Sequence, residues 1–415
     1  MGSSIEKKII NLLAFLTVYG NASLIKTGSP LIFHISMLLC FLLYIIYFQK
    51  LLKIKATIIL IAILTIISSI INFSNEINIS NLFSFTFYLI FFSILITKHK
   101  SMLFDRMSYL IHLLAICSIL IKITIFAFPF LWSMFPISYN VPNYGPYYNA
   151  FIFTQPVSIT LRNQSIFWEP GAWAVNQTIA YYWLIVVKKK HKLLITYALS
   201  ILLTFSTSGI LLFFIIVLYL LVHDKKFRKK YRKTLFVFSS AMIFLFIQLV
   251  SIIDPEGFLL KNSISKIEST ISIKPLREYY DQDTYVKKYN TWGSFEDRLH
   301  TYAIAFYKTL ESPFLGFGRI EGRSESYYQT SIFGQILIQH GFIYLFIWVV
   351  LLYRSIILKS GLIKIMFILL LTYAEPYAFS TVFTFLIAFG ANINKQLELN
   401  NFSELYNKKL ISTSI

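Results

Sequence analysis

The chain has 415 residues, of which 56% are apolar, 18% aromatic and 14% charged, and its formal net charge is +19. About a quarter of the residues of a soluble domain are charged, so this composition excludes an ordinary soluble globular protein. The excess of Lys and Arg lies in connections between apolar segments, where it sets membrane orientation, and this placement argues against nucleic acid as a partner.

Repeated apolar segments of membrane-spanning length predict an all-α polytopic membrane protein, with residues 1–415 in a single integral membrane domain. The two cysteines lie within these segments, which predicts neither a disulfide nor a thiolate metal site. About twelve transmembrane helices are predicted, at residues 9–25, 30–49, 56–73, 80–97, 107–133, 169–187, 193–206, 208–223, 235–252, 331–353, 361–376 and 379–394.

Basic connections follow every second predicted span. By the positive-inside rule, these connections and both termini lie in the cytoplasm. The outward connections are short turns except for two long loops, at 134–168 and 253–328. The second loop carries ten Lys or Arg against eleven Asp or Glu, so its charges are not needed for orientation and are available for another role.

The first long loop ends in the sequence RNQSIFWEPG at 162–171. Pro170 suits the first turn of a helix and places Glu169 at or beside the N-cap, where the helix dipole favours a carboxylate. Glu169 is therefore either a helix cap or a carboxylate facing an outward cavity, with Asn176 two turns deeper on the same face. Because an amide is costly in lipid, Asn176 is expected to face the bundle interior or water.

The second long loop ends in SFEDRLHTYAIAFYKTLESPFLGFGR, at 294–319. A capping box at Ser294 and an apolar stripe predict an amphipathic helix near 296–312, which Pro313 ends and which packs along the outer membrane face. Arg298 and Tyr302 share a face away from that stripe, and the GFG turn presents Arg319. The stripe consists of Leu299, Ala303, Phe306 and Leu310.

In this order, the elements resemble the Wzy-type polysaccharide polymerases and the related O-antigen ligases. The resemblance covers roughly residues 160–350 and the overall topology. Many relatives, ligases especially, carry a His-Asn pair before the helix after the second loop, where this chain has Thr330 and Ser331. The matching pieces are Arg162 with FWEPG, the STSG turn at 206–209, Arg298, PFLGFG at 313–318, and Gly341.

The resemblance implies a membrane glycosyltransferase that polymerises oligosaccharide repeats linked to undecaprenyl diphosphate into a surface polysaccharide, such as a capsule or the O-antigen of lipopolysaccharide. The reaction would take place at the outer face of the bacterial cytoplasmic (inner) membrane. The implied partners are this lipid-linked oligosaccharide, membrane lipid, and a chain-length regulator and flippase of the same pathway.

The chemistry suggests a role for each candidate. The leaving lipid diphosphate is anionic, and guanidinium groups bind phosphate oxygens bidentately; the acceptor hydroxyl needs a general base. Glu169 and Arg298 are the predicted catalytic residues, and Glu375 is the runner-up for the base. The predicted substrate-binding residues are Arg162, Arg319, Asn176, Tyr302 and Trp168.

Three alternatives stay open at this stage. The DQD sequence at 281–283 could hold a divalent ion, but arginines can neutralise a diphosphate, so neither a metal nor another cofactor is expected. An O-antigen ligase of the same superfamily is the nearest rival function. A flippase or secondary transporter is the rival from another class, although no internal repeat joins the two halves of the chain.

Overall fold

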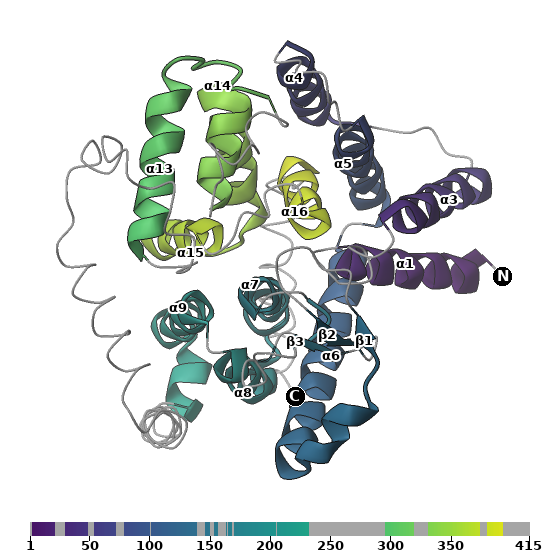
Figure 1. Ribbon diagram of the computed structural model, residues 1–415, viewed down its shortest axis with the longest axis vertical. Coiled ribbons are helices and arrows are strands. Elements are labelled where there is room, and N and C mark those ends of the chain that lie inside the picture. The colour runs from purple at the N-terminus through teal and green to yellow at the C-terminus, as the bar shows by residue number, and fades with distance from the viewer. Residues whose placement is uncertain are drawn as a thin grey trace, which may run out of the picture.

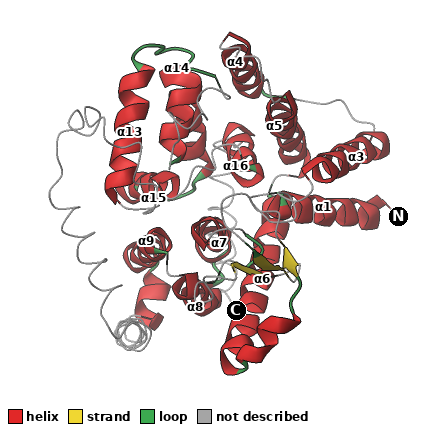
Figure 2. Cartoon of the chain, viewed as in Figure 1, coloured by secondary structure: helices red, strands yellow, loops and turns green. Residues whose placement is uncertain are grey.

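The structure is a computed structural model. It describes residues 2–20, 30–48, 54–71, 79–99, 101–138, 146–149, 153–156, 163, 165–167, 170–204, 206–231, 295–318, 331–373 and 380–392. This part of the chain is mostly helical, with three short strands (Figure 2). The helices are α1 (Gly2–Tyr19), α3 (Pro30–Phe48), α4 (Ala56–Ile71), α5 (Ile79–His99), α6 (Met102–Ala127), α7 (Pro170–Tyr181), α8 (Leu194–Thr204), α9 (Thr207–His223), α13 (Phe295–Thr309), α14 (Ile332–Ser355), α15 (Gly361–Tyr373) and α16 (Thr381–Asn392).

Apart from α13, each described helix overlaps a predicted span, and the span predicted at 235–252 lies outside the described residues. Two of the described helices, α6 and α14, are long and apolar enough to cross a membrane, and most of the others are shorter apolar helices. Large apolar side chains are exposed along many of them, as on α3 at Ile32, Leu39 and Leu43. These features are consistent with an all-α membrane protein whose outer surface faces lipid.

Several helix boundaries differ from the predicted ones. Helix α1 begins at Gly2 rather than at residue 9, and α6 begins at Met102 rather than at residue 107. The helix placed at 107–133 ends at Ala127, because Pro129 has no N–H for an α-helical bond and opens a 3₁₀ turn (Pro129–Met134). The helix placed at 296–312 ends at Thr309, because the ring of Pro313 would meet the carbonyl four residues earlier. Three i→i+3 bonds close that end, from the N–H groups of Leu310, Glu311 and Ser312.

The first long loop contains a three-stranded antiparallel sheet that the sequence analysis did not predict. The order is β1 (Ile137–Ser138), β2 (Tyr147–Asn149) and β3 (Thr154–Pro156), with Ile137 opposite Tyr148, and Tyr148 opposite Gln155. The sheet lies against α6 (Figure 1).

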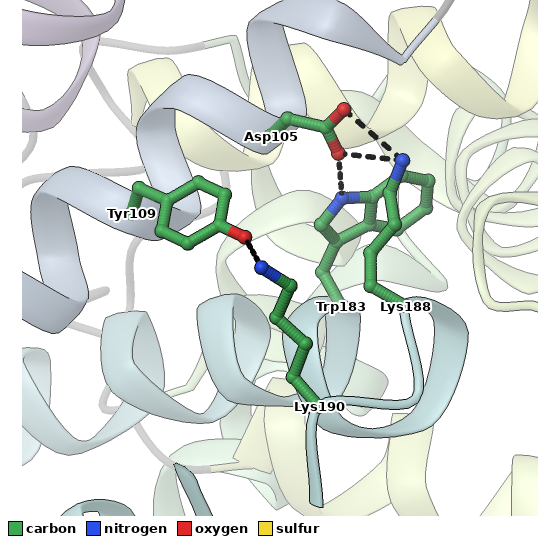
Figure 3. Close-up of polar contacts among 5 residues, drawn as sticks. All are labelled: Asp105, Tyr109, Trp183, Lys188 and Lys190. Carbon is green, nitrogen blue, oxygen red and sulfur yellow. Dashed lines mark hydrogen bonds and ion pairs between the residues drawn. The ribbon is translucent and has the colours of Figure 1, made fainter. Parts of the chain in front are cut away.

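Two of the basic connections, after α7 and after α9, contact each other, and the first also contacts the start of α6. Asp105, at the start of α6, accepts hydrogen bonds from the Trp183 indole (2.7 Å) and the Lys188 ammonium (3.0 Å), while Lys190 contacts the Tyr109 hydroxyl (Figure 3). The Asp224 carboxylate, after α9, lies 3.3 Å from the His191 ring. The helix ends that the charge pattern assigned to one side therefore contact one another.

Helix α16 lies between α5 and α14 and also contacts α1 and α4 (Figure 1). Its aromatic side chains pack in the protein interior. Phe385 and Phe389 contact Phe104, and the Phe104 ring stacks on Trp183 with centroids 4.2 Å apart. This packing brings α14 next to α4, α13 and α15.

Candidate functional site

Helix α14 is broken in its middle. Gly341 has φ 76° and ψ −176°, outside the helical region, so the backbone ladder is interrupted about ten residues after the helix begins. A β-carbon at this position would lie 2.7 Å from the Pro313 carbonyl oxygen and from the Phe314 carbonyl carbon. Only glycine fits here, for reasons of both conformation and space.

The PFLGFG loop, residues 313–318, supplies the hydrogen bonds that the break removes. The N–H groups of Phe317 and Gly318 donate to the Ile338 and Gln339 carbonyls (2.8 and 2.9 Å), and the Phe342 N–H donates to the Pro313 carbonyl (2.8 Å). Backbone groups buried within a membrane protein need such partners. The loop and the two halves of α14 therefore form one hydrogen-bonded unit, which continues directly into Arg319.

Helix α13 packs along the N-terminal half of α14 (Figure 1). Its buried residues are Thr301, Ala303, Ala305 and Thr309, and Ala303 belongs to the expected apolar stripe. Phe306 and Leu310 of the expected stripe are instead 39% and 53% exposed. Phe306 still makes an edge contact with Phe342 of α14, with ring centroids 6.0 Å apart. That the helix covers a cavity stays a prediction.

Polar side chains gather around the break in α14. The His340 Nδ1 lies 2.5 Å from the Ser68 hydroxyl of α4, and the Thr65 hydroxyl donates to the Tyr344 hydroxyl (3.1 Å). Gln339 is fully buried, and its amide has no hydrogen-bond partner among the described residues. In a membrane bundle, such a polar group at a helix break marks a candidate ligand site.

The first long loop is fixed at its end by a second set of contacts. Asn163 is fully buried: its amide nitrogen donates to the Ser118 hydroxyl of α6 (3.1 Å), and its backbone N–H donates to the Leu203 carbonyl of α8 (2.7 Å). The Thr154 hydroxyl, on β3, donates to the carbonyls of Ser165 and Phe167. Residues 163–167 therefore connect β3, α6 and α8.

A lysine of α6 lies beneath the same sheet. The Lys122 ammonium is almost fully buried, donates to the Gln155 side chain (3.1 Å) and lies over the rings of Trp132 and Phe153. Gln155 and both rings come from the segment that follows α6, so Lys122 ties that segment to the helix. Lys122 is one turn after Ser118, and both therefore face the loop.

The STSG turn at 206–209 lies at the start of α9, next to the start of α7. The Ser206 hydroxyl caps α9 by accepting from the Gly209 N–H (3.3 Å). A β-carbon on Gly209 would lie 2.7 Å from the Ala174 side chain, so α7 and α9 approach closely where both begin. The Phe167 ring stacks on Trp173 of α7 at 5.5 Å. Residues 163–167 and the starts of α7 and α9 therefore lie together.

The predicted site residues fall into three groups. Four of them, Arg162, Trp168, Glu169 and Arg319, lie outside the described residues, as do Glu375 and the DQD sequence at 281–283. Arg298 lies in α13, but its side chain is not described. Tyr302 stacks on Tyr373 of α15 with centroids 6.0 Å apart, and Asn176 is buried and donates to the Ala172 carbonyl (2.8 Å).

Two polar side chains were not chosen from the sequence as site residues. Lys122 was noticeable as an intramembrane charge, but its contact with Gln155, 33 residues later, had no local signal. Gln339 lies two residues before Gly341 in an apolar helix. A polar residue so close to a glycine could have indicated a site at this position from the sequence. In the part of the chain that the structure describes, no group of three His, Cys, Asp or Glu side chains could hold a metal.

One family model is similar to part of this chain. The family model described as O-antigen ligase matches residues 193–349, which include the STSG turn, α13, the PFLGFG loop and the break in α14. The match supports the O-antigen polymerase and ligase superfamily of membrane glycosyltransferase-like enzymes, without separating the two activities. No curated protein and no solved structure matches the chain.

Proposed function

We propose that this protein polymerises lipid-linked oligosaccharide repeats into a surface polysaccharide by glycosyl transfer from undecaprenyl diphosphate. The observation that carries the proposal is the PFLGFG loop bound into the break of α14, inside the segment that matches the O-antigen ligase family. This unit anchors the chain directly before Arg319, which has the charge that a diphosphate leaving group requires.

The first long loop supplies the second part of the argument. Asn163 and Pro170 are fixed in place next to Arg162 and Glu169, one by hydrogen bonds and the other as the first residue of α7. An arginine and a carboxylate held so near each other in sequence fit a phosphate ligand and a general base for the acceptor hydroxyl.

We place the two anchored loops at the same end of the molecule. The Tyr182 hydroxyl, after α7, accepts a hydrogen bond from the Ile357 N–H, after α14, so the C-terminal ends of these two helices meet. We place the N-terminal ends, which follow the two loops, on the side opposite the basic connections, as the charge pattern predicts. This arrangement favours a single site that uses Arg162, Glu169, Arg298 and Arg319, in the outward half of the protein.

Two other functions are each favoured by one observation. The matched family is described as O-antigen ligase, which favours transfer of a finished glycan onto an acceptor; Thr330 and Ser331 in place of the His-Asn pair favour a polymerase instead. The broken helix α14 is a feature shared with transporters, whose sites lie at discontinuous helices. The family match favours a transferase over a transporter.

Analysis of glycans in a deletion strain separates these functions. Loss of a polymerase leaves single repeats on the lipid carrier and on the final acceptor. Loss of a ligase leaves full-length polymer on the lipid carrier, and loss of a flippase leaves single repeats at the inner face of the membrane. We expect the first pattern; either of the other two would overturn the polymerase proposal.

A pair of variants on α13 tests the site itself. Arg298→Lys keeps the charge but loses the planar, bidentate guanidinium, so polymer formation should fall roughly thirty- to a thousand-fold, as expected for about 2–4 kcal/mol of lost transition-state stabilisation. The matched control is Lys308→Arg, because Lys308 lies on the same helix and pairs with Glu311 at 2.8 Å. Wild-type polymer from Arg298→Lys at equal expression would remove Arg298 from the site.

A further inference from the structure

The basic segment after α9 is a folded helix. Residues 225–231 are helical, and Asp224, with φ −110° and ψ 95°, separates them from α9. The Asp224 side chain caps this segment by accepting from the Phe227 N–H (2.9 Å), and its carbonyl accepts from the Arg228 N–H (2.9 Å). An orientation signal needs only positive charge in a connection, so a capped helix here calls for a further explanation.

One edge of the segment is docked against the protein. Phe227 is 1% exposed, and its ring makes an edge contact with His191 (5.1 Å between centroids) and packs on Tyr231 at 5.0 Å. Asp224 adds contacts to His191 at 3.3 Å and to Lys189 at 3.9 Å. The segment is therefore held against the connection between α7 and α8 in a defined orientation.

The remaining faces of the segment are cationic. Because Phe227 and Tyr231 are four residues apart, they occupy one edge of the helix and leave the others to solvent. No acidic residue lies between 225 and 231 in the sequence. The exposed side chains are Lys225, Lys226, Arg228, Lys229 and Lys230, a set that we call the basic face.

The apolar surface of α9 indicates what lies next to the basic face. Leu211, Phe214, Leu218 and Val222 are each 45–51% exposed and follow one another at spacings of three or four residues, which makes an apolar stripe suited to lipid. This stripe ends at Val222, three residues before the first cation of the basic face. Cations that directly follow a lipid-facing stripe lie at the depth of the phospholipid headgroups.

From this geometry we infer that the basic face is a binding site for anionic phospholipid headgroups. The ligand chemistry is a phosphodiester anion at the membrane surface, held by several ammonium and guanidinium groups on one rigid helix. Within a polybasic segment of this kind, each Lys or Arg near the surface contributes about fivefold in affinity. The interaction is expected to weaken as ionic strength rises, because the charges are exposed.

The test compares two variants of the full-length protein that lose the same charge. In one, Lys226, Lys229 and Lys230 are changed to Gln; in the control, the exposed Lys7, Lys8 and Lys55 are changed to Gln. Each purified protein is placed in nanodiscs of phosphatidylcholine with and without phosphatidylglycerol, and the retained phosphatidylglycerol is measured by mass spectrometry after extraction. Retention should fall at least tenfold in the first variant and stay near wild type in the control.

Two further measurements distinguish a lipid site from the alternatives. A variant with the same three lysines changed to Arg keeps the charge and should retain the lipid, which also covers the event that the Gln variant folds poorly. Inorganic phosphate alone should neither stabilise the protein nor displace the lipid; stabilisation by free phosphate would assign the face to a soluble anion. Wild-type retention in the Gln variant, or equal loss in the control, would overturn the inference.

Discussion

The two long loops are attached to the helices in different ways. The first is held mainly by side chains: Asn163 bonds Ser118 of α6, Thr154 bonds two carbonyls near the loop end, and Lys122 contacts Gln155. The second is held by main-chain bonds between residues 313–318 and the broken middle of α14.

This difference indicates which substitutions each loop tolerates. A side-chain attachment depends on the residue types at a few polar positions and on their full burial. A main-chain attachment accepts many side chains but needs close contact between backbones, and therefore glycine. Gly316 and Gly341 both have positive φ angles, and a β-carbon on either would meet the backbone of the opposite segment at 2.6–2.7 Å.

The largest effect is expected from Gly341→Ala. Alanine would be strained at this φ, and its β-carbon would push the 313–318 loop out of the break, so we expect a loss of about 3 kcal/mol or more together with loss of activity. Gly361→Ala is the control, because a β-carbon there meets nothing within 4 Å. Thermal unfolding in detergent provides the measurement, and equal melting temperatures for the two variants would show that the loop does not need the break.

A smaller effect is expected from Asn163→Ala in the first loop. This change leaves the Ser165 N–H and the Ser118 hydroxyl without their amide partner in a fully buried place, at a cost of about 1–3 kcal/mol. The exposed Thr124→Ala, also on α6, removes only a bond to its own helix and should be near neutral. Limited proteolysis should detect opening of the first loop while the 295–318 segment stays protected; if both regions opened together, the two attachments would not be independent.

The contacts of Asp105 with Lys188 and Trp183, at the other end of the helices, provide stability changes to compare with those of the two loop attachments. Lys188→Ala removes an ammonium from Asp105, but the two side chains are 35% and 29% exposed, so the stability change should stay below about 1 kcal/mol. Asp105→Ala should cost more, because the Trp183 indole N–H also loses its acceptor. Equal melting temperatures for the two variants would show that the indole bond contributes nothing.

The smallest expected effect is the pH dependence of folding stability that His191 contributes. Burial lowers the pKa of His191, and this outweighs the nearby Asp224 carboxylate, which raises it; Lys189 and Lys230 lower it further. The folded protein thus binds this proton more weakly than the unfolded chain, so stability is fully present above the ordinary histidine pKa of about 6.5 and declines as pH falls below it. The difference in melting temperature between wild type and His191→Asn should therefore change from pH 7.5 to pH 5; a constant difference would contradict the prediction.

Several features of this protein are determined by the sequence alone. Apolar segments of spanning length set the helix positions, because a backbone in lipid has to satisfy its hydrogen bonds within each segment. The alternating basic connections identified the helix ends that meet around Asp105 and Asp224. The order of RNQSIFWEPG, STSG and PFLGFG indicated the superfamily that the family match supports.

Other features were decided by tertiary contacts. The PFLGFG sequence looks like an ordinary flexible turn until the helix 23 residues beyond it opens at Gly341 and offers carbonyls that its N–H groups can reach. The buried residues of α13 depend on its contact with α14, where Ala305 packs with Leu337 and Ile338, and amphipathic spacing does not identify that contact. Lys122 and Gln155, 33 residues apart, meet only because the sheet folds back onto α6. Periodicity and local chemistry act within a few turns of chain, whereas these contacts depend on which segments the whole bundle brings together.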